Sequence, residues 1–335
     1  MLRSGIIGVG GISRKHYNGI ANHPEMELVG ISDINEQVMK QRAEEWGAKA
    51  YPDYRELIDA CDVIVVCTPP ASHAEQTIAA AEAGKHVLCE KPMALTLRDA
   101  DAMIAAAGKS GITLMIGHNP HFTSGSRTMW EIFDSGDLGE LIYCWIKRNN
   151  YFSKSGWERR IAQKHWRLTH EESGGRLFEQ IHMINFLVWI GGEPVSAYGH
   201  MATLTDGIEV DEFDVAMLNF HTGFAHLELS MTPCTVRESS VGILGTKGSI
   251  VETGGEIRMR LKHQDQEQEV PAAAELDMYQ HFVDCINTGR KPENDGLDGR
   301  ITLAGCIAFY ESARSGRLIR VDELEAEDNR TDCNH

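Results

Sequence analysis

Hydrophobic positions near the start of the chain alternate between short apolar runs and segments with helical periodicity. The run at 62–67 is apolar at nearly every position, which is typical of a parallel strand buried on both faces. A helical segment over 36–46 is followed by Gly47, a residue that often ends helices. Repeated strand and helix signals of this kind predict a Rossmann domain over 1–118, with a doubly wound parallel sheet.

The pattern changes after residue 118. Residues 213–220 and 225–231 alternate apolar and polar positions, which predicts strands with one buried face. We therefore expect an α+β domain over 119–321, with a large, open, mostly antiparallel sheet and helices on one side. A partner subunit would cover the open face, so a homodimer or homotetramer is expected. Residues 322–335 are predicted to form an acidic, solvated tail that includes Asp322, Glu323, Glu325, Glu327 and Asp328.

Composition narrows the class of protein. The 335 residues are 42% hydrophobic and 24% charged, as in soluble globular proteins. The net charge of −17 argues against binding to nucleic acid or to an anionic membrane. No apolar run approaches the roughly 18 residues of a membrane span, and the first residues are predicted to form a strand and not a signal peptide.

The spacing of the cysteines and histidines indicates the cellular compartment of the protein and whether it binds a metal. Eight cysteines are scattered without a C-x-x-C pair, so we expect free thiols and a cytoplasmic location. His118 with His121, and His165 with His170, lack a third ligand in the local pattern. No metal site is predicted.

A glycine turn occupies residues 8–13, between the first strand and a helix. Gly8 would permit the tight turn, Gly10 the close approach of a pyrophosphate, and the helix N-terminus would donate N–H groups to the phosphates. The next predicted strand ends at Asp33, which can accept hydrogen bonds from ribose hydroxyls and would repel a 2′-phosphate. NAD is therefore expected in preference to NADP.

Residues 86–93 combine an apolar strand with an abrupt stop at Pro92. Glu90 and Lys91 then lie at the carboxyl end of a strand, where open α/β sheets bind ligands. An isolated Glu-Lys pair would more often be a surface ion pair. Its position in a nucleotide-binding domain favours a functional role.

A second candidate group lies on a predicted helix over 177–190, introduced by two glycines and ended by two more. Glu179 and His182 are three residues apart, so both are expected on one helical face. A single histidine on such a helix is more often a buried structural residue, and the neighbouring carboxylate favours a site. Trp166 and Arg167, just upstream, would supply a flat wall and a cation.

These motifs together resemble the Gfo/Idh/MocA family, named for glucose-fructose oxidoreductase and inositol dehydrogenase. The resemblance rests on the glycine turn, Asp33, residues 67–73, the unbroken stretch 84–93, and the glycines before His182, and it extends to about Val321. It implies a Rossmann domain followed by an oligomerising α/β domain. The implied activity is NAD(P)-dependent oxidation or reduction of a sugar, sugar derivative or cyclitol.

The resemblance also implies the site residues. Lys91 matches the lysine that the family places between nicotinamide and substrate. Family members often have an aspartate four residues before the histidine, where this chain has Phe178, and an arginine at the position of His121. The predicted cofactor contacts are Gly8, Gly10, Gly11, Ile12, Ser13, Asp33, Thr68, Pro69, His73, Glu90, Lys91 and Asn119. The predicted substrate contacts are Lys91, Trp166, Arg167 and His182, with Tyr151, Trp157 and Tyr279 as further candidates.

Alcohol oxidation needs a hydride acceptor, a base and a group that fixes the reacting oxygen. We assign these roles to NAD, His182 and Lys91, with Glu90 orienting Lys91 and Glu179 orienting His182 or balancing its charge. Two alternatives stay open. One is a glycoside hydrolase or lyase that uses NAD in a transient redox cycle, and the other is a noncatalytic dinucleotide-binding regulator. Neutral sugars, amino sugars, inositols and sugar acids all remain open as substrates.

Overall fold

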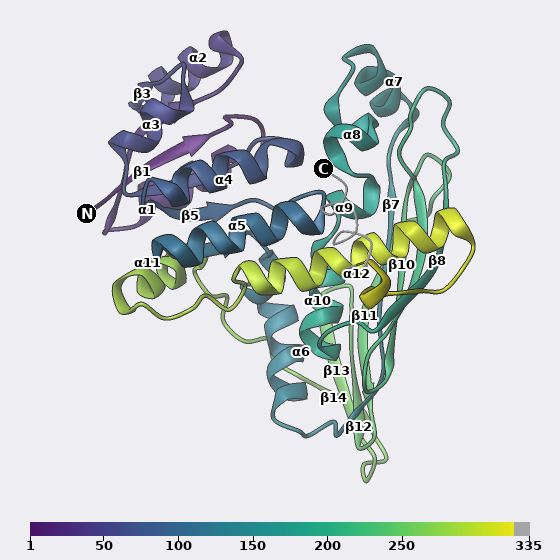
Figure 1. Cartoon of the computed structure of the whole chain (residues 1–335). Coiled ribbons are helices and arrows are strands. Elements are labelled where there is room, and N and C mark those ends of the chain that lie inside the picture. The colour runs from purple at the N-terminus through teal and green to yellow at the C-terminus, as the bar shows by residue number, and fades with distance from the viewer. Residues whose placement is uncertain (325–335) are drawn as a thin grey trace. The chain divides into compact units, whose positions relative to one another are not determined.

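The computed structural model describes residues 1–324 and divides them into two compact units. The first unit contains Met1–His118 and Asp277–Arg300, and the second contains Asn119–Leu276 and residues 301–324. Figure 1 shows both units with their elements labelled. Glu325, Glu327 and Asp328 of the predicted acidic tail lie outside the described residues, whereas Asp322 pairs with Arg320 at 2.8 Å.

The first unit is built on a parallel sheet in the order β3-β2-β1-β4-β5-β6, the doubly wound arrangement that the sequence predicts. All four residues of the central strand Val63–Val66 are fully buried, as its continuous apolar run requires. The strands are β1 (Leu2–Ile7), β2 (Met26–Ser32), β3 (Lys49–Ala50), β4 (Val63–Val66), β5 (His86–Cys89) and β6 (Leu114–Ile116).

Local signals begin and end the helix Glu36–Trp46 where the sequence predicts. Asn35 caps the helix Glu36–Trp46 by accepting from Val38 N at 3.1 Å, and Gly47 closes it in the left-handed region. The helices are α1 (Ser13–Asn22), α2 (Glu36–Trp46), α3 (Tyr54–Ala60), η1 (Pro70–Ser72), α4 (His73–Glu82), α5 (Leu97–Ser110) and α11 (Met278–Thr288).

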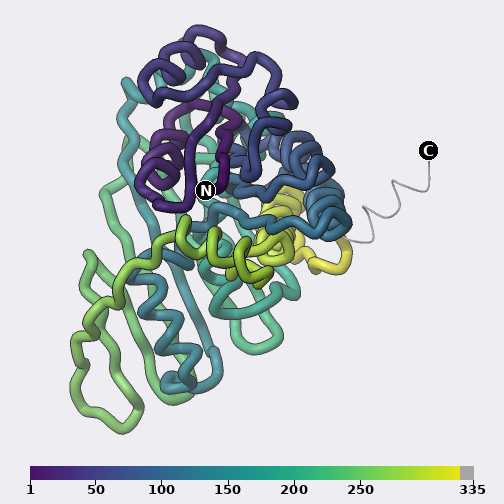
Figure 2. The backbone as a smooth tube through the Cα atoms, turned by 90° about the vertical axis from the view of Figure 1, so that its left-hand side faces the viewer, coloured from purple at the N-terminus to yellow at the C-terminus, as the bar shows by residue number. Residues whose placement is uncertain are grey.

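The segment Asp277–Arg300 joins the first unit although most of the second unit precedes it in the chain. Figure 2 shows this yellow-green segment beside the purple and blue parts of that unit. Its helix α11 packs on α1, where Gly19 leaves room for the Tyr279 ring. The sequence pattern, which places these residues in the predicted domain 119–321, contains no sign of this return.

The second unit contains a nine-stranded sheet in the order β14-β13-β12-β11-β7-β10-β9-β8-β15. Neighbouring strands are antiparallel except β7 and β10, which are parallel. This confirms the predicted mostly antiparallel sheet. The strands are β7 (Leu141–Tyr151), β8 (Ser196–Ala202), β9 (Phe213–Asn219), β10 (Phe224–Thr232), β11 (Glu238–Gly245), β12 (Gly248–Thr253), β13 (Glu256–Leu261), β14 (Gln268–Glu269) and β15 (Ile319–Arg320).

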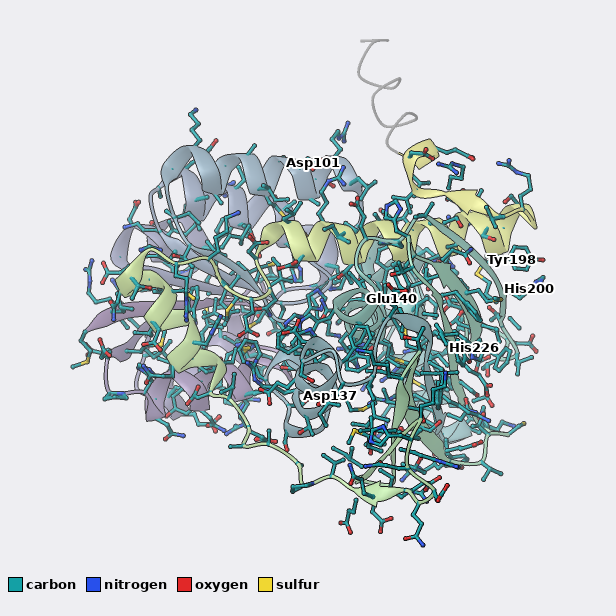
Figure 3. All side chains as sticks on the ribbon, turned by 90° about the horizontal axis from the view of Figure 1, so that it is seen from below. Asp101, Asp137, Glu140, Tyr198, His200 and His226 are labelled. Atoms are coloured by element: carbon teal, nitrogen blue, oxygen red, sulfur yellow. The ribbon has the colours of Figure 1, made fainter. Side chains whose placement is uncertain are left out.

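Helices cover one face of this sheet. Helix α12 packs Phe309 against Gly199 of β8, and α10 packs on β7 and β10 (Figure 1). Tyr198, His200 and His226 extend from the sheet in Figure 3. The helices are η2 (Asn119–His121), α6 (Ser124–Asp134), α7 (Lys154–Ala162), η3 (Trp166–Leu168), α8 (His170–Ser173), α9 (Arg176–Glu179), α10 (His182–Gly191) and α12 (Gly296–Ser315), of which residues 296–300 belong to the first unit. Among residues 1–324, no helix has the length and apolar character needed to cross a membrane.

Candidate active site

The glycine turn follows β1 at the carboxyl edge of the parallel sheet. Gly8 has φ +87°, and a Cβ there would lie 2.8 Å from Thr68 N, so the turn requires glycine. At Gly10 and Gly11 an added Cβ would meet no atom within 4 Å, and the N-terminus of α1 has no side-chain cap. Open backbone beside uncapped N–H groups fits a dinucleotide pyrophosphate.

Asp33 follows β2 at the same edge of the sheet. Its Oδ2 accepts from Val9 N at 2.8 Å, and its Oδ1 accepts from Asn35 N at 2.8 Å. Two main-chain donors therefore fix the carboxylate beside the glycine turn. This position fits the ribose-binding role that the sequence predicts.

His73 connects two loops of the predicted cofactor site. It is 1% exposed, and its ring nitrogens each lie 2.8 Å from a carbonyl oxygen, Nδ1 from that of Pro92 and Nε2 from that of Thr68. Burial lowers the pKa of His73, while the two carbonyl oxygens oppose this shift, because only the protonated ring can donate from both nitrogens. The histidine thus ties the loop after β4 to the loop after β5.

Glu90 belongs to a buried hydrogen-bonded chain that sequence reasoning missed. Its Oε1 lies 2.8 Å from His16 Nε2, and the Tyr279 hydroxyl lies 2.6 Å from His16 Nδ1. The Lys91 N–H donates to Glu90 Oε2 at 3.2 Å. We call Tyr279, His16 and Glu90 the Glu90 chain. Ser13, His16 and Ile20 form the buried stripe of α1, so helical spacing alone would have placed His16 toward the sheet.

The charge state of this chain follows from its surroundings. Burial by itself would raise the pKa of Glu90, but the hydrogen bond from His16 and the charge of Lys91 outweigh it and lower the pKa to about 2. Burial also raises the pKa of Tyr279 well above its usual range, so its hydroxyl keeps its proton. Glu90 is therefore an ionised, fixed carboxylate next to Lys91, and Tyr279 is an internal hydrogen-bond donor of the first unit.

In the second unit, Asp211 fixes the start of α9. Its carboxylate accepts from Arg176 N at 3.1 Å, from Leu177 N at 3.2 Å and from the Tyr310 hydroxyl at 2.9 Å. We call Asp211 and Tyr310 the Asp211 clamp. Gly175 has φ +133°, and a Cβ there would overlap the Tyr310 hydroxyl and lie 2.8 Å from Asp211 Oδ1. Only glycine fits this approach.

A second buried carboxyl group stands behind the clamp. Burial and the neighbouring Asp211 raise the pKa of Asp214 well above its usual range. This shift favours the protonated form of Asp214. A protonated Asp214 can donate a hydrogen bond to Asp211, which explains how two carboxyl groups share this site.

The single predicted helix over 177–190 is wrong. The chain forms α9 and α10 with a break at Gln180 and Ile181, where Gln180 has φ −103° and ψ 21°. The Asp211 clamp holds the N-terminus of α9, whereas the apolar residues of α10 pack on the sheet. These two attachments set different helix positions, so the local helical potential is overridden.

His182 is the first residue of α10. Its Nε2 lies 3.3 Å from Arg148 Nη1, which donates because arginine has no acceptor. His182 Nε2 therefore carries a lone pair and not a proton in this arrangement. Arg148 lies on β7, on the same face as the buried residues Cys144 and Ile146. A cation in the buried register of a strand was the signal that could have identified it.

Glu179 pairs with arginines from two other segments. It forms ion pairs with Arg167 Nε and with Arg176 Nη1, and Arg160 lies close enough to interact electrostatically with it. We call Arg160, Arg167 and Arg176 the arginine group. Arg167 also stacks its guanidinium 4.1 Å from the centroid of Trp166, so the two predicted substrate residues are neighbours.

The remaining candidates occupy different environments. Trp157 is 1% exposed, and its ring centroid lies 5.1 Å from Arg176 Cζ. Tyr151 is exposed at the end of β7. His121, at the position where the family often has an arginine, is buried and stacks on Trp189 with ring centroids 4.0 Å apart. Asn119, a predicted cofactor contact, opens η2 directly after the first unit's contiguous chain.

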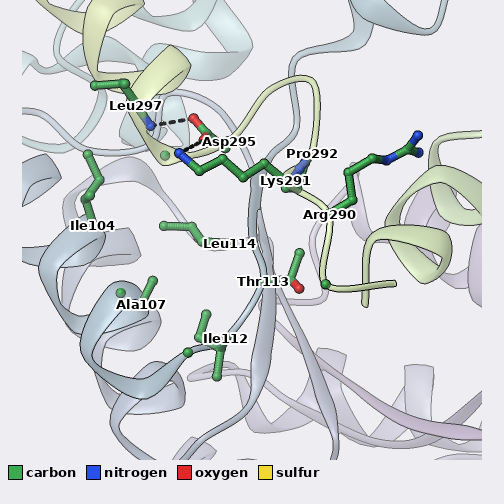
Figure 4. Close-up of a pocket in the computed structure, with 14 residues that line it drawn as sticks. Ile104, Ala107, Ile112, Thr113, Leu114, Arg290, Lys291, Pro292, Asp295 and Leu297 are labelled. Atoms are coloured by element: carbon green, nitrogen blue, oxygen red, sulfur yellow. Dashed lines mark hydrogen bonds and ion pairs between the residues drawn. The ribbon is translucent and has the colours of Figure 1, made fainter. Parts of the chain in front are cut away.

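A cavity of about 370 Å³ lies at the opposite end of the parallel sheet (Figure 4). It is lined by the end of α5, the segment before β6 and residues 289–297, where Asp295 accepts from Leu297 N at 2.8 Å. Parallel sheets bind nucleotides at the carboxyl ends of their strands, and this cavity is at the amino end of β6. We therefore do not assign it to the cofactor.

Known proteins with similar sequences agree with this geometry. Residues 2–118 match an oxidoreductase family with an NAD-binding Rossmann fold, which defines the class of protein as a nicotinamide-dependent oxidoreductase. Residues 126–251 match the C-terminal domain of GFO/IDH/MocA proteins. The chain belongs to the Gfo/Idh/MocA oxidoreductase family, as its motifs predict. The family supports the predicted enzyme class, an NAD(P)-dependent dehydrogenase acting on CH–OH groups.

Individual relatives cover much of the chain. An uncharacterised oxidoreductase of Streptococcus pneumoniae is 31% identical over 264 residues, which are 75% of this chain and 68% of the relative. The 2,7-anhydro-N-acetylneuraminate hydratase of Escherichia coli is 29% identical over 78% of this chain and 82% of its own length. The WlbA dehydrogenase of Bordetella pertussis, solved with NADH and UDP-GlcNAcA, is 27% identical with a TM-score of 0.81, over 95% of this chain and 98% of its own.

Proposed function

We propose that this protein transfers a hydride between the nicotinamide of NAD and a hydroxyl-bearing carbon of a sugar, sugar derivative or cyclitol. The observation that carries the proposal is the Glu90 chain. It holds an ionised carboxylate next to Lys91 at the carboxyl end of β5, where this fold binds nucleotides. A surface ion pair would not need a buried histidine and tyrosine beneath it.

Each chemical role has a residue in the proposal. NAD, when bound, accepts the hydride. Lys91 holds the reacting oxygen, and its charge favours loss of the hydroxyl proton. His182 accepts that proton at Nε2, where the substrate hydroxyl takes the place of the Arg148 N–H as hydrogen-bond partner. Glu90 orients Lys91, whereas Glu179 balances the arginine group that it contacts directly.

The proposal favours NAD over NADP because of Asp33. Its carboxylate is fixed by two main-chain N–H groups, so it cannot easily turn away from a 2′-phosphate. Ile34 and Asn35, which follow it, offer no cation for such a phosphate. We also propose a cytoplasmic homo-oligomer formed through the open face of the second unit's sheet, which light scattering of the purified protein would test.

The test is turnover with NAD, and separately NADP, against a panel of sugars, cyclitols and sugar acids, followed by NADH absorbance. Lys91→Ala and His182→Ala are each expected to lower kcat at least about 1,000-fold, because each removes a group that acts on the reacting oxygen. Calorimetric NAD binding should stay within about threefold of wild type in the His182 variant. Wild-type turnover in either variant would refute these roles.

A second candidate function follows from the hydratase relative. The same Lys91 and His182 would serve a hydrolase, lyase or hydratase in which NAD is reduced and reoxidised within one cycle. Such an enzyme would keep its cofactor bound and release no net NADH while product accumulates. Mass analysis of the sugar products alongside NADH absorbance separates the two reactions. A protein that binds NAD but converts no sugar would instead be a noncatalytic regulator.

A further inference from the structure

The three guanidinium groups of the arginine group carry more positive charge than the single carboxylate of Glu179 can balance. Arg167 and Arg176 share Glu179, and the described residues provide Arg160 with no other carboxylate partner. Asp214, behind the Asp211 clamp, interacts electrostatically with Arg176, but Glu179 is the one carboxylate among the groups that shift the pKa of Arg160. An excess of this kind is unusual in a protein whose net charge is −17.

Arg160 is the member that is left unmatched. Within residues 1–324 its guanidinium makes no hydrogen bond or ion pair, and its Nη1 is buried. The group lies 4.5 Å from the centroid of Phe152 and 5.5 Å from that of Trp157. Burial lowers the pKa of Arg160, the charge of Glu179 partly opposes this, and Arg176 and Arg167 lower it further. Aromatic rings therefore hold a half-buried cation in place without neutralising it.

A purely structural network would be expected to match its buried charges, because an unpaired buried ion destabilises the fold. A bound anion would balance the charge of Arg160. Arginine held flat against aromatic rings suits carboxylate and phosphate, since its planar fork donates two parallel hydrogen bonds to either. Arg167, with a side chain 31% exposed, gives a ligand access to the same group.

The arginine group is also close to the proposed base. Glu179, which binds two of its members, is three residues before His182, so their Cα atoms are at most about 11 Å apart. Arg148 adds another cation, 3.3 Å from His182 Nε2. An anionic group on the substrate of His182 would thus be within one or two sugar lengths of the arginines.

We propose that the substrate is an anionic sugar, with a carboxylate or phosphate that binds Arg160 and Arg167 of the arginine group. This inference rests on the proposed function for its reaction and names the class of substrate. Arg160 is a specificity-determining residue in this proposal, and it takes no part in hydride transfer. Neutral sugars and cyclitols of the same ring shape would bind weakly because they leave Arg160 unpaired.

The test compares matched ligands on the NAD-loaded, full-length protein. D-glucose, D-glucuronate and D-glucose 6-phosphate form one set, and the corresponding galactose compounds form a second. Calorimetry measures binding, and NADH absorbance measures turnover. In at least one set the uronate or the phosphate ester is expected to bind at least about 10-fold tighter than the neutral parent. Comparing the uronate with the phosphate ester identifies which of the two anionic groups the site binds.

Matched variants assign the effect to Arg160. Arg160→Met keeps an apolar stem against Phe152 and should weaken binding of the preferred anion about 10- to 100-fold, with little change for the neutral parent. Arg160→Lys keeps the charge but not the fork, so an intermediate loss is expected, and this variant serves if the methionine variant does not fold. Arg159→Met removes the same charge from the exposed neighbour on α7 and should bind the anion like wild type.

The outcomes separate this inference from the proposed function. Anion-selective binding that depends on Arg160, with no NADH formed, would support the inference and refute hydride transfer as the net reaction. NADH formation with neutral sugars, and no anionic member bound more tightly, would overturn the inference and leave the dehydrogenase in place. Equal losses in the Arg160→Met and Arg159→Met variants would also overturn it.

Discussion

The Glu90 chain of the first unit and the arginine group of the second differ in how their charges are matched. In the Glu90 chain, the carboxylate has His16 and the Lys91 main-chain N–H as hydrogen-bond partners and the Lys91 charge beside it, and Tyr279 completes the hydrogen bonds. In the arginine group, Glu179 is the carboxylate shared by its members, and Arg160 keeps an unpaired buried nitrogen.

This difference in charge balance indicates a different role for each region. A network that satisfies its own donors and acceptors holds one geometry, which suits a group that must place Lys91 for every substrate. A network with surplus charge is completed by a ligand, which suits recognition of a variable substrate. Both units nevertheless use a buried tyrosine and carboxylate to hold their site segments, with Tyr310 and Asp211 in the second unit.

The largest expected effect comes from breaking the Asp211 clamp. Gly175→Ala places a Cβ against the Tyr310 hydroxyl and Asp211 at φ +133°, so we expect a loss of about 3 kcal/mol or more in unfolding free energy. Gly255→Ala is the control. Gly255 has φ +90° but open space around it, so backbone strain alone should cost about 1 kcal/mol. Urea unfolding measures both, and equal losses would contradict the role of the clamp.

A smaller effect is expected from removing the charge of the Glu90 chain. Glu90→Gln keeps the side-chain shape but loses the ionised partner of Lys91, and we expect kcat to fall about 100-fold with the NAD affinity nearly unchanged. Glu75→Gln, which removes an exposed carboxylate paired with Arg55, should keep wild-type turnover.

The effect of Glu90→Gln on the unfolding free energy is expected to depend on pH. Because the folded pKa of Glu90 is lowered to about 2, its ionised form stabilises the fold above the unfolded pKa of about 4.5. That contribution is lost as the pH falls from about 4.5 through about 2. The stability difference between wild type and Glu90→Gln should shrink over this window in urea titrations. A difference independent of pH would contradict the ionised state of Glu90.

The smallest effect tests the carboxyl pair behind the clamp. The pKa of Asp214 is raised, so the folded protein holds a proton that the unfolded chain releases, and stability falls as the pH rises above the unfolded pKa. Asp214→Asn removes this titration and keeps a donor for Asp211. We expect the variant to gain stability relative to wild type as the pH rises above the unfolded pKa of Asp214, by up to about 1.4 kcal/mol per pH unit. Parallel pH profiles of the two proteins would contradict a protonated Asp214.

Local sequence signals predicted much of the first unit. The helix Glu36–Trp46 has its predicted bounds because Asn35 caps it and Gly47 ends it, both through contacts within a few residues. The glycine turn and Asp33 were predicted for the same reason, since the strand, turn and acid follow a fixed local order. The Glu90 chain was not predicted, because His16 and Tyr279 are 263 residues apart in the chain.

In the second unit the sequence determined the strands and identified Glu179, His182, Trp166 and Arg167 as candidates, because period-two alternation and short motifs are local properties. Only the tertiary structure broke the predicted helix at Gln180, because the Asp211 clamp and the sheet hold its two parts separately. Likewise, only the fold brought arginines from α7, η3 and α9 to one carboxylate. Whether a buried charge has a partner of opposite charge depends on residues that only folding brings close. The tertiary structure therefore decided that Arg160 is the arginine available to a ligand.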